Sequence, residues 1–394
     1  MDKLPLEIIE KILFYLNPYE DYPHTIYVSK KFCQATRNII KYRSRNFEVS
    51  FRNDRINFWK YRRFSEQLVP PSCAHHRGAI CGQRMFIVSN QIFWSFDLVE
   101  RKWTKLSFAP QELYAKALFK FENKIVVFLG PSWDHESDQD QDKSDSSVLL
   151  YDTEKNQVTC ITEKAKPPCR FLTNPTVMGT QAVLVHYNPK KSSSGMSDIH
   201  CLDLESLTWT SETAICRDQP IELETLCQIK ISENQLVYIG ATWHGEEAWL
   251  LEIGVFFKWT RLSVFNEEHA PKKAEHLSKL VRMGRLAVCL APAENASCQV
   301  GNRCCRHRDG RKKFSSLHML DLSQAVDHRQ LTWLRPSRAC AIRGVLTGYT
   351  LLATPYEILV FGGLREDSKG RKTESNSLYT TYMATDDTSS AKSI

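Results

Sequence analysis

A motif in which an acidic residue follows an apolar residue, and in most copies precedes another, recurs along most of this 394-residue chain. The acidic residues of five copies are Asp97, Asp152, Asp203, Glu252 and Asp321. A tryptophan follows four copies and a valine follows the other, at positions Trp103, Val158, Trp209, Trp259 and Trp333. These positions are 55, 51, 50 and 74 residues apart. A period near fifty residues predicts an array of similar structural units.

The chain from about residue 75 onward has the pattern of short β-strands. Apolar and polar residues alternate in runs of strand length, and turn-forming residues separate the runs. One small sheet cannot bury both of its faces, whereas sheets packed radially around an axis bury each other's faces. The repeat therefore predicts an all-β body made of radially packed sheets.

Glycine ends several of the predicted strands. A glycine pair closes Phe361-Gly362-Gly363, and single glycines close Phe128-Leu129-Gly130 and Tyr238-Ile239-Gly240. With the tryptophan spacing, this pattern resembles a divergent kelch repeat, whose inner strands are expected to end in two glycines. The resemblance implies a kelch-type β-propeller of about six blades over residues 73–386, with a disordered tail at 387–394.

The first sixteen residues predict an amphipathic helix. Pro5 suits a first helical turn, where its missing N–H leaves no hydrogen bond unmade, and Asn17-Pro18 ends the helix. Its apolar stripe consists of Ile8, Ile9, Ile12, Leu13 and Leu16. Such a stripe must be buried, and the short segment that follows offers little cover. We therefore expect another protein to cover this helix.

The N-terminal order Leu-Pro-x-Glu-Ile-Ile-x-x-Ile-Leu, then x-x-Leu-x-Pro and Val-Ser-Lys-Lys-Phe, resembles an F-box over residues 1–47. The apolar positions of that motif are filled by Leu4, Pro5, Ile8, Ile9, Ile12, Leu13, Leu16, Val28 and Phe32. Phe32 stands where the motif often has tryptophan. The polar stretch Asp21-Tyr22-Pro23 replaces an aliphatic pair, so we expect the second helix to begin late.

The F-box resemblance implies a division of labour within an α+β multidomain protein. An F-box docks on a Skp-family adaptor and, through it, on the cullin and RING subunits of a ubiquitin ligase. The nine residues above are therefore candidate adaptor-binding residues, and the propeller would hold an unknown protein client. Two other classes remain open: a propeller scaffold capped internally by its N-terminal helices, and an RNA-associated protein that uses residues 41–64.

Residues 48–72 are predicted to be a basic, aromatic linker. Eleven Lys and Arg residues lie between positions 30 and 63, opposed there only by Glu48 and Asp54. Aromatic residues lie among these charges at Phe47, Phe51, Phe58, Trp59, Tyr61 and Phe64. Stacking on RNA would use such a pattern. We favour packing of these rings against the next domain, so we expect no nucleic-acid partner.

The chain carries no sequence motif for catalysis, such as Gly-x-Ser-x-Gly, a phosphate-binding loop or His-Glu-x-x-His. It has no run of eighteen apolar residues and no basic-then-apolar leader. We therefore expect a non-enzymatic protein without a cofactor or a membrane span, located in the cytoplasm or the nucleus. The thirteen cysteines are then expected to be reduced.

Two segments contain possible metal ligands. Asp138, Asp140 and Asp142 resemble the start of a calcium loop, but Lys143 and Leu149 stand where an EF-hand needs glycine and glutamate. We therefore expect a solvated acidic insertion rather than a calcium site.

The other segment, residues 294–316, is an insertion in the fifth unit with Cys298, Cys304, Cys305 and His307. Paired Cys-x-x-Cys spacing is missing, so we expect no zinc. The insertion also carries Arg303, Arg306, Arg308, Arg311, Lys312 and Lys313. These basic residues could bind an acidic client, and a solvated loop is the alternative we favour.

Overall fold

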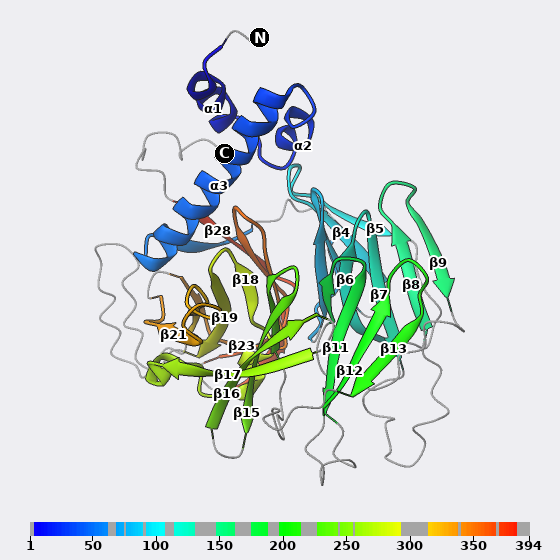
Figure 1. Ribbon diagram of the computed structural model, residues 1–394, viewed down its shortest axis with the longest axis vertical. Coiled ribbons are helices and arrows are strands. Elements are labelled where there is room, and N and C mark those ends of the chain that lie inside the picture. Colours follow the sequence, from blue (N-terminus) through cyan, green and yellow to red (C-terminus); the bar gives the residue numbers. More distant parts are fainter. Residues whose placement is uncertain are drawn as a thin grey trace.

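The computed structural model describes residues 4–61, 68–74, 76–89, 92–106, 114–130, 147–161, 175–187, 197–213, 227–242, 245–254, 257–292, 314–337, 340–367 and 370–383. Three helices at the N-terminal end precede a body of β-sheets (Figure 1). The chain is therefore an α+β multidomain protein with a propeller-like C-terminal part, as the sequence predicts.

The N-terminal helices are α1 (Leu6–Phe14), α2 (Asp21–Thr25) and α3 (Lys30–Arg52). Pro5 precedes the first residue of α1, where its missing N–H is not needed. The Ser29 hydroxyl caps α3 by accepting a hydrogen bond from the Phe32 N–H at 3.3 Å. The Asn17 N–H donates to the Asp21 carboxylate at 2.7 Å, which supports the late start of α2.

Most strands of the described residues form six units of four antiparallel strands. The first three units are β2 (Arg77–Cys81), β3 (Arg84–Ser89), β4 (Ile92–Asp97) and β5 (Trp103–Leu106); β6 (Tyr114–Phe121), β7 (Lys124–Gly130), β8 (Ser147–Asp152) and β9 (Gln157–Ile161); and β10 (Thr176–Met178), β11 (Gln181–Tyr187), β12 (Ser197–Asp203) and β13 (Trp209–Thr213).

The fourth and fifth units are β14 (Cys227–Ser232), β15 (Gln235–Thr242), β16 (Gly245–Ile253) and β17 (Phe257–Phe265), and β18 (Val281–Met283), β19 (Leu286–Pro292), β20 (Phe314–Asp321) and β21 (Gln330–Leu334). The sixth unit is β24 (Thr350–Ala353), β25 (Ile358–Phe361), β28 (Leu378–Met383) and β1 (Ile56–Lys60). The outer strands β17 and β21 also pair in parallel, which joins the fourth and fifth units.

The sixth unit is completed by a strand from the N-terminal part of the chain. β1 pairs antiparallel with β28, from Ile56 opposite Met383 to Lys60 opposite Tyr379. Ile56 is completely buried. The predicted linker at 48–72 is therefore wrong, because its first residues belong to α3 and residues 56–60 form an outer strand. The alternation of apolar and polar side chains in this strand suits an edge with one buried face.

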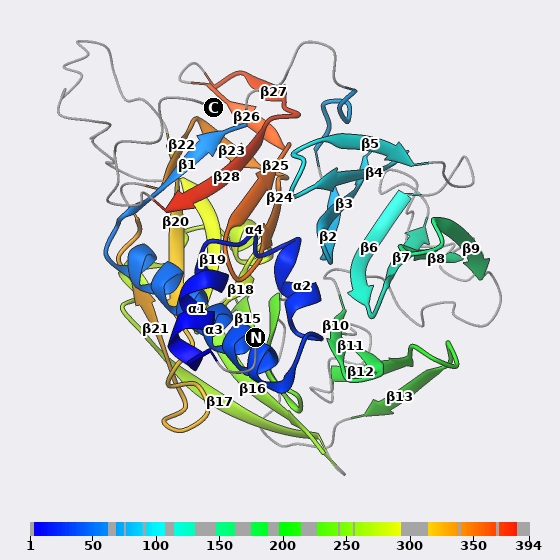
Figure 2. The ribbon, with the colours of Figure 1, turned by 90° about the horizontal axis from the view of Figure 1, so that it is seen from above.

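The first strands of the six units form a closed ring. β2 contacts β6, β6 contacts β10, β10 contacts β14, β14 contacts β18, β18 contacts β24, and β24 contacts β2. Seen from above, the sheets radiate from this common axis (Figure 2). Ring closure leaves no first strand with an unprotected edge toward the axis.

The repeated motif occupies the same place in five units. The residue before each acid pairs with the tryptophan position, as Phe96↔Trp103, Tyr151↔Val158, Leu202↔Trp209, Leu251↔Trp259 and Leu320↔Trp333. In four of these units the acid is aspartate, and its side chain caps the turn into the fourth strand. Asp203, for example, accepts hydrogen bonds from the N–H groups of Glu205 at 3.0 Å and Ser206 at 2.7 Å. A short side-chain acceptor at this turn explains the recurrence of aspartate.

The glycine pair lies in a different strand from the one predicted. Gly362 and Gly363 follow β25, the second strand of the sixth unit, so the expectation that they end an inner strand is wrong. Gly362 has φ +67°, and a Cβ there would lie 2.2 Å from a ring carbon of His76. Glycine is needed here because both the backbone conformation and the close ring exclude a side chain.

Six smaller elements complete the described structure: η3 (Glu267–His269), α4 (Ala274–Leu277), β22 (Ala341–Arg343), β23 (Val345–Thr347), β26 (Leu364–Glu366) and β27 (Lys372–Glu374). β22 pairs with β20, and β23, β26 and β27 form a small separate sheet. Of the helices that the structure describes, none combines the length and apolar character needed to cross a membrane.

Candidate functional site

Two sides of α1 have different neighbours. Ile9 and Leu13 have no exposed surface and pack with Tyr22, Ala35 and Ile39 of α2 and α3. The expectation that the chain itself offers little cover for this helix is wrong for Ile9 and Leu13. The 23-residue α3 is long enough to lie along α1 and to cover this side.

Ile8 and Ile12 lie one helical turn apart on the neighbouring side of α1. Their exposed fractions are 44% and 49%, although each adjoins a fully buried residue in the sequence. The apolar surface of α1 is therefore wider than the surface that α3 covers. Full burial of such a side chain is worth about 1.5–3 kcal/mol, so this side is suited to a partner.

Further exposed apolar residues lie just before α1 and α3. Leu4 is 36% exposed, Val28 is 59% exposed, and Pro5 is also exposed. The Lys31 ammonium donates a hydrogen bond to the carbonyl of Leu4. This contact brings the segment before α1 to the first turn of α3, three residues after Val28.

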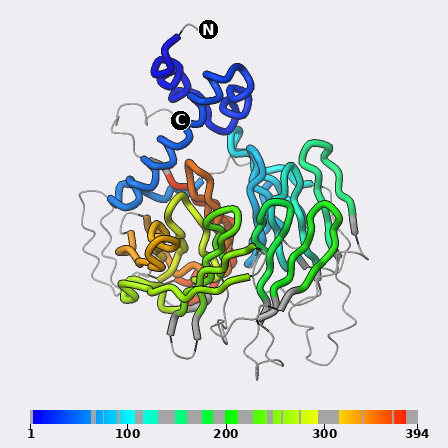
Figure 3. The backbone as a smooth tube through the Cα atoms, viewed as in Figure 1, coloured from blue at the N-terminus to red at the C-terminus, as the bar shows by residue number. Residues whose placement is uncertain are grey.

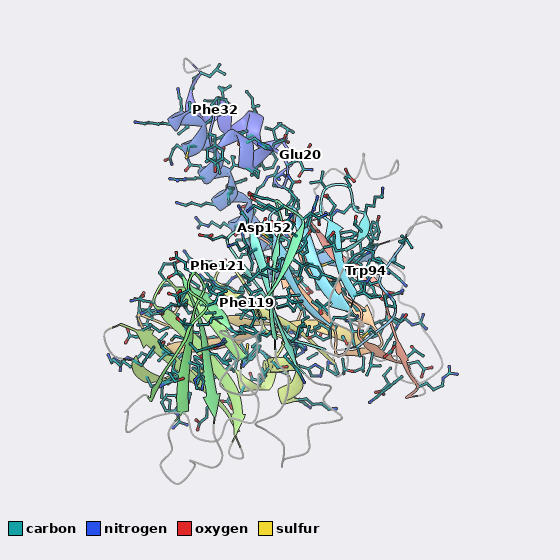
Figure 4. The ribbon with its side chains drawn as sticks, turned by 90° about the vertical axis from the view of Figure 1, so that its right-hand side faces the viewer. Glu20, Phe32, Trp94, Phe119, Phe121 and Asp152 are labelled. Carbon is teal, nitrogen blue, oxygen red and sulfur yellow. The ribbon has the colours of Figure 1, made fainter. Side chains whose placement is uncertain are left out.

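The structure divides the nine predicted adaptor-binding residues into two groups. The exposed group, here called the docking surface, is Leu4, Pro5, Ile8, Ile12 and Val28. In the other group, Ile9 and Leu13 are completely buried, and Leu16 and Phe32 are partly buried against the same cluster. Phe32 lies in this domain, well separated from Trp94 and Phe119 of the body (Figure 4). Ile9 and Leu13 therefore stabilise the domain from inside, and Leu16 and Phe32 keep part of their surface accessible.

Exposed aromatic side chains of the same domain lie outside the nine predicted adaptor-binding residues. Phe14, Tyr15 and Tyr27 are all exposed, and Tyr27 precedes Val28 of the docking surface. The Arg43 guanidinium lies 5.0 Å from the centroid of the Phe14 ring. A helical wheel places Phe14 about 100° around α1 from Leu13. It could therefore have shown that the two side chains lie on different sides of the helix.

A buried carboxylate joins the helical domain to the body. Glu357, in the turn between β24 and β25, accepts a hydrogen bond from the Tyr19 hydroxyl at 2.8 Å. The two terminal nitrogens of Arg101 donate to the two carboxylate oxygens of Glu357, each at 3.1 Å. Burial and the charge of Glu357 raise the pKa of Tyr19 far above its ordinary value, so its hydroxyl remains a donor.

The C-terminal end of α3 is part of the core of the body. Phe47 and Phe51 are almost completely buried in its largest apolar cluster, and their rings meet edge to face at 4.9 Å. Arg52 forms ion pairs with Asp321 at 2.8 Å and with Glu48 at 3.1 Å. α3 therefore runs as one continuous helix from the docking surface to the body (Figure 3).

The helices cover only one face of the body. They contact its turns between first and second strands at Glu357 and Arg285, and the end of a third strand at Asp321. In Figure 1 this is the upper face. Because strands within a unit are antiparallel, each first strand begins at the opposite end, here called the far face.

The possible metal ligands, for which the sequence predicts no metal site, fall outside the described residues. This applies to Asp138, Asp140 and Asp142 in segment 131–146, and to the Cys298–His307 cluster with its basic neighbours in segment 293–313. Within the described ranges, no group of three or more His, Cys, Asp or Glu side chains is placed to hold a metal ion.

Comparisons with known proteins bear on both parts of the chain. Residues 1–44 match the F-box domain family, so the predicted F-box is confirmed. The match covers α1, α2, much of α3 and all nine predicted adaptor-binding residues. A solved structure, "Structure of YjhT", is similar with 13% sequence identity and a TM-score of 0.49, over 79% of this chain and 95% of that chain.

Proposed function

We propose that this protein is the substrate-recognition adaptor of a cullin–RING ubiquitin ligase of the Skp–cullin–F-box type. Its N-terminal F-box domain supports this role, because F-box domains generally bind a Skp-family protein and their carriers are generally non-catalytic adaptors. In this proposal the propeller-like body is of the kelch type and binds the protein client. The protein works in the cytoplasm or the nucleus.

The observation that carries the proposal is the unequal burial of the apolar residues of α1. Ile9 and Leu13 hold the domain together, whereas Ile8, Ile12 and the nearby Val28 are exposed. Because these side chains are about half exposed, covering each contributes roughly half of the 1.5–3 kcal/mol of full burial, before the costs of association are subtracted. The docking surface can therefore support a stable complex without unfolding the domain.

The anchoring of α3 adds a geometric argument. Phe51 and Arg52 fix the helix in the body, and Ser29 caps its other end near the docking surface. A client on the body is then held at a constant position relative to the ligase. Such tethering raises the local concentration of client lysines near the ubiquitin-conjugating enzyme.

Co-purification of the full chain with a Skp-family adaptor tests the proposal. The double variant Ile8→Glu/Ile12→Glu should abolish co-purification, because it places two charges in an apolar interface. Its melting temperature should stay close to that of the wild type, because both side chains are exposed.

The matched control changes two other exposed residues of α1, as Glu7→Gln/Lys11→Gln. This control should co-purify like the wild type. A folded Ile8→Glu/Ile12→Glu protein that still co-purifies with the adaptor would contradict the docking role.

A second experiment tests the client part of the proposal. Affinity purification followed by mass spectrometry should recover the same clients with the wild type and with Ile8→Glu/Ile12→Glu. Ubiquitinated forms of those clients should appear only with the wild type. Clients that are lost together with the adaptor would show that the body does not bind them by itself.

A further inference from the structure

The outward side of α3 carries a row of cations, here called the basic row. Arg37, Lys41 and Arg45 follow one another about one helical turn apart, and all three side chains are exposed. Glu48, the one acidic residue of α3, pairs with Arg52 at 3.1 Å. Within the described part of the chain, no carboxylate forms an ion pair with the basic row. Its charge is therefore available to another molecule.

An apolar row runs beside these cations. Tyr42 and Val49 lie close to two helical turns apart and are 53% and 46% exposed. Arg45 lies three residues after Tyr42 and four before Val49, so it neighbours both on the surface of α3. The ring centroid of Phe14, at the end of α1, lies 6.3 Å from that of Tyr42 and extends the apolar row onto α1. The two rows together are here called the α3 patch.

The α3 patch and the docking surface lie on different sides of α1. Phe14 follows Ile12 by two positions, which is about 200° around the helix. The Arg43 guanidinium holds this end of α1 by donating a hydrogen bond to the Phe14 carbonyl and by lying 5.0 Å from the centroid of its ring. An adaptor that covers Ile8 and Ile12 therefore leaves the Phe14 side of α1 open.

The basic row leads to the fifth unit of the body. Glu48, three residues after Arg45, accepts a hydrogen bond at 3.3 Å from the N–H of Arg285, in the turn between β18 and β19. The Arg285 side chain is exposed, so a further cation lies on the body beside the end of the row. A segment bound along the α3 patch would therefore reach the body.

The chemistry of the α3 patch suits an acidic and partly apolar protein segment. Exposed apolar surface beside charged residues is typical of interaction sites, and tyrosine and arginine are enriched among the residues that dominate binding. Nucleic acid fits less well, because successive bases stack on several rings. Phe47 and Phe51 are buried in the body, and Tyr42 is the one exposed ring over the whole described length of α3.

We propose that the α3 patch binds an acidic amphipathic segment of the protein client, an inference that rests on the proposed function. The client is the source because the basic row continues to Arg285 of the body, which holds the client in that proposal. Carboxylates of the segment face the basic row, and its aliphatic side chains cover the apolar row. The bound client then contacts both α3 and the body.

The test uses the full chain and fluorescein-labelled peptides followed by anisotropy. The probe is a helical peptide with leucines along one face and glutamates beside them. One comparison peptide has glutamine in place of glutamate, and another has serine in place of leucine. The probe should bind more tightly than either, and added salt should weaken its binding because salt screens exposed charges. Equal binding of the three peptides, or tighter binding of a labelled oligouridine RNA, overturns the proposal.

Two variants of the α3 patch test where the probe binds. Lys41→Glu/Arg45→Glu should weaken its binding by roughly tenfold or more, because two attractive charges become repulsive. Tyr42→Ser/Val49→Ser should have a similar effect, because it removes the apolar contacts. All four side chains are exposed, so both variants should melt like the wild type.

The matched control Lys258→Glu/Arg371→Glu reverses the same charges on the body, at side chains that are 66% and 73% exposed. It should bind the probe like the wild type. Equal binding by this control and by Lys41→Glu/Arg45→Glu overturns the proposal.

Two further measurements separate the α3 patch from the docking surface. Ile8→Glu/Ile12→Glu should bind the probe like the wild type, and loss of the probe there would assign the peptide to the docking surface and overturn the inference. Lys41→Glu/Arg45→Glu should still co-purify with the Skp-family adaptor. Loss of the adaptor would make the α3 patch part of the docking surface and also overturn the inference. Probe binding without any adaptor binding would contradict the proposed function alone.

Discussion

The helical domain and the β body treat their apolar side chains differently. Among the described residues, nine of the fourteen large exposed hydrophobic side chains lie between positions 4 and 49. The much longer body contributes the other five: Trp59, Leu68, Val158, Phe265 and Val326. The body thus buries nearly all of its apolar surface itself, whereas the helical domain keeps a surplus that another molecule can cover.

The largest expected effect comes from cutting the chain between these two parts at different positions. A fragment of residues 70–394 lacks Phe47, Phe51 and Ile56, each of which is almost completely buried. Loss of one such side chain costs about 2–5 kcal/mol, and all three together exceed the stability of many domains. We expect this fragment to aggregate, whereas residues 46–394 should remain soluble and melt cooperatively.

Size-exclusion chromatography and thermal melts of the two fragments measure this difference. Equal solubility and equal melting temperatures would show that the body folds without β1 and the end of α3. The comparison would then fail, because the body would not depend on the N-terminal segment.

Substitutions on the buried and the exposed side of α1 should differ in their effect on stability, by less than the two fragments differ. Leu13→Ala leaves a cavity among α1, α2 and α3 and should destabilise the helical domain by about 2–5 kcal/mol. Ile12→Ala, one residue away but half exposed, should change the stability by less than about 1 kcal/mol. Hydrogen exchange of the α1 and α3 amides in the full chain reports this difference. Similar acceleration in both variants would contradict the unequal burial.

A smaller effect on stability is expected at Glu357, where the helical domain contacts the body. Glu357→Gln removes the charge that faces Arg101 and weakens the acceptor of the Tyr19 hydroxyl. We expect the free energy of unfolding, measured with urea, to fall by about 1–3 kcal/mol. The carboxylate is buried, and its hydrogen bonds are strengthened by its charge. The control Asp367→Asn breaks an exposed pair with Arg371 and should cost less than about 1 kcal/mol. Equal losses in both variants would mean that burial of this contact has no consequence.

The smallest expected effect is a gain in stability that depends on pH. Burial and Arg77 lower the pKa of Lys279 to about 8 in the folded protein, below the ordinary value of 10.5. The unfolded chain therefore binds more protons between these values, and the wild type becomes more stable as the pH rises from 8 to 10.5. Lys279→Met should raise the melting temperature at pH 7 and lose this advantage at high pH.

The control for this prediction is Lys258→Met, whose side chain is 66% exposed. It should show no pH-dependent advantage over the wild type. A Lys279→Met advantage of constant size from pH 7 to pH 10 would mean that the gain comes from apolar burial and not from the removed charge.

The repeat made the β body predictable from the sequence. The tryptophan position pairs with the residue before the acid in five units, although the connection between the third and fourth strands is longer in the fifth unit. The strand at Ile56–Lys60 was missed because its partner, β28, is more than three hundred residues away in the sequence. The local pattern of apolar and polar residues does not indicate a partner strand so far away in the sequence.

The docking surface was predicted only as part of a larger set. A helical spacing of apolar residues predicts an apolar stripe. It does not show which residues of the stripe are buried by the same chain and which remain for a partner. Ile8 and Ile9 are equivalent in the pattern, and only the course of the long α3 decides that Ile9 is buried and Ile8 is not.

Hydroxyl-radical footprinting of the full chain, with and without the Skp-family adaptor, tests the central claim most directly. The account predicts that oxidation of Ile8, Ile12 and Tyr27 falls when the adaptor is added, while oxidation of the exposed Trp59 and Phe265 stays unchanged. Unchanged oxidation of Ile8 and Ile12 in a complex that has formed would contradict it.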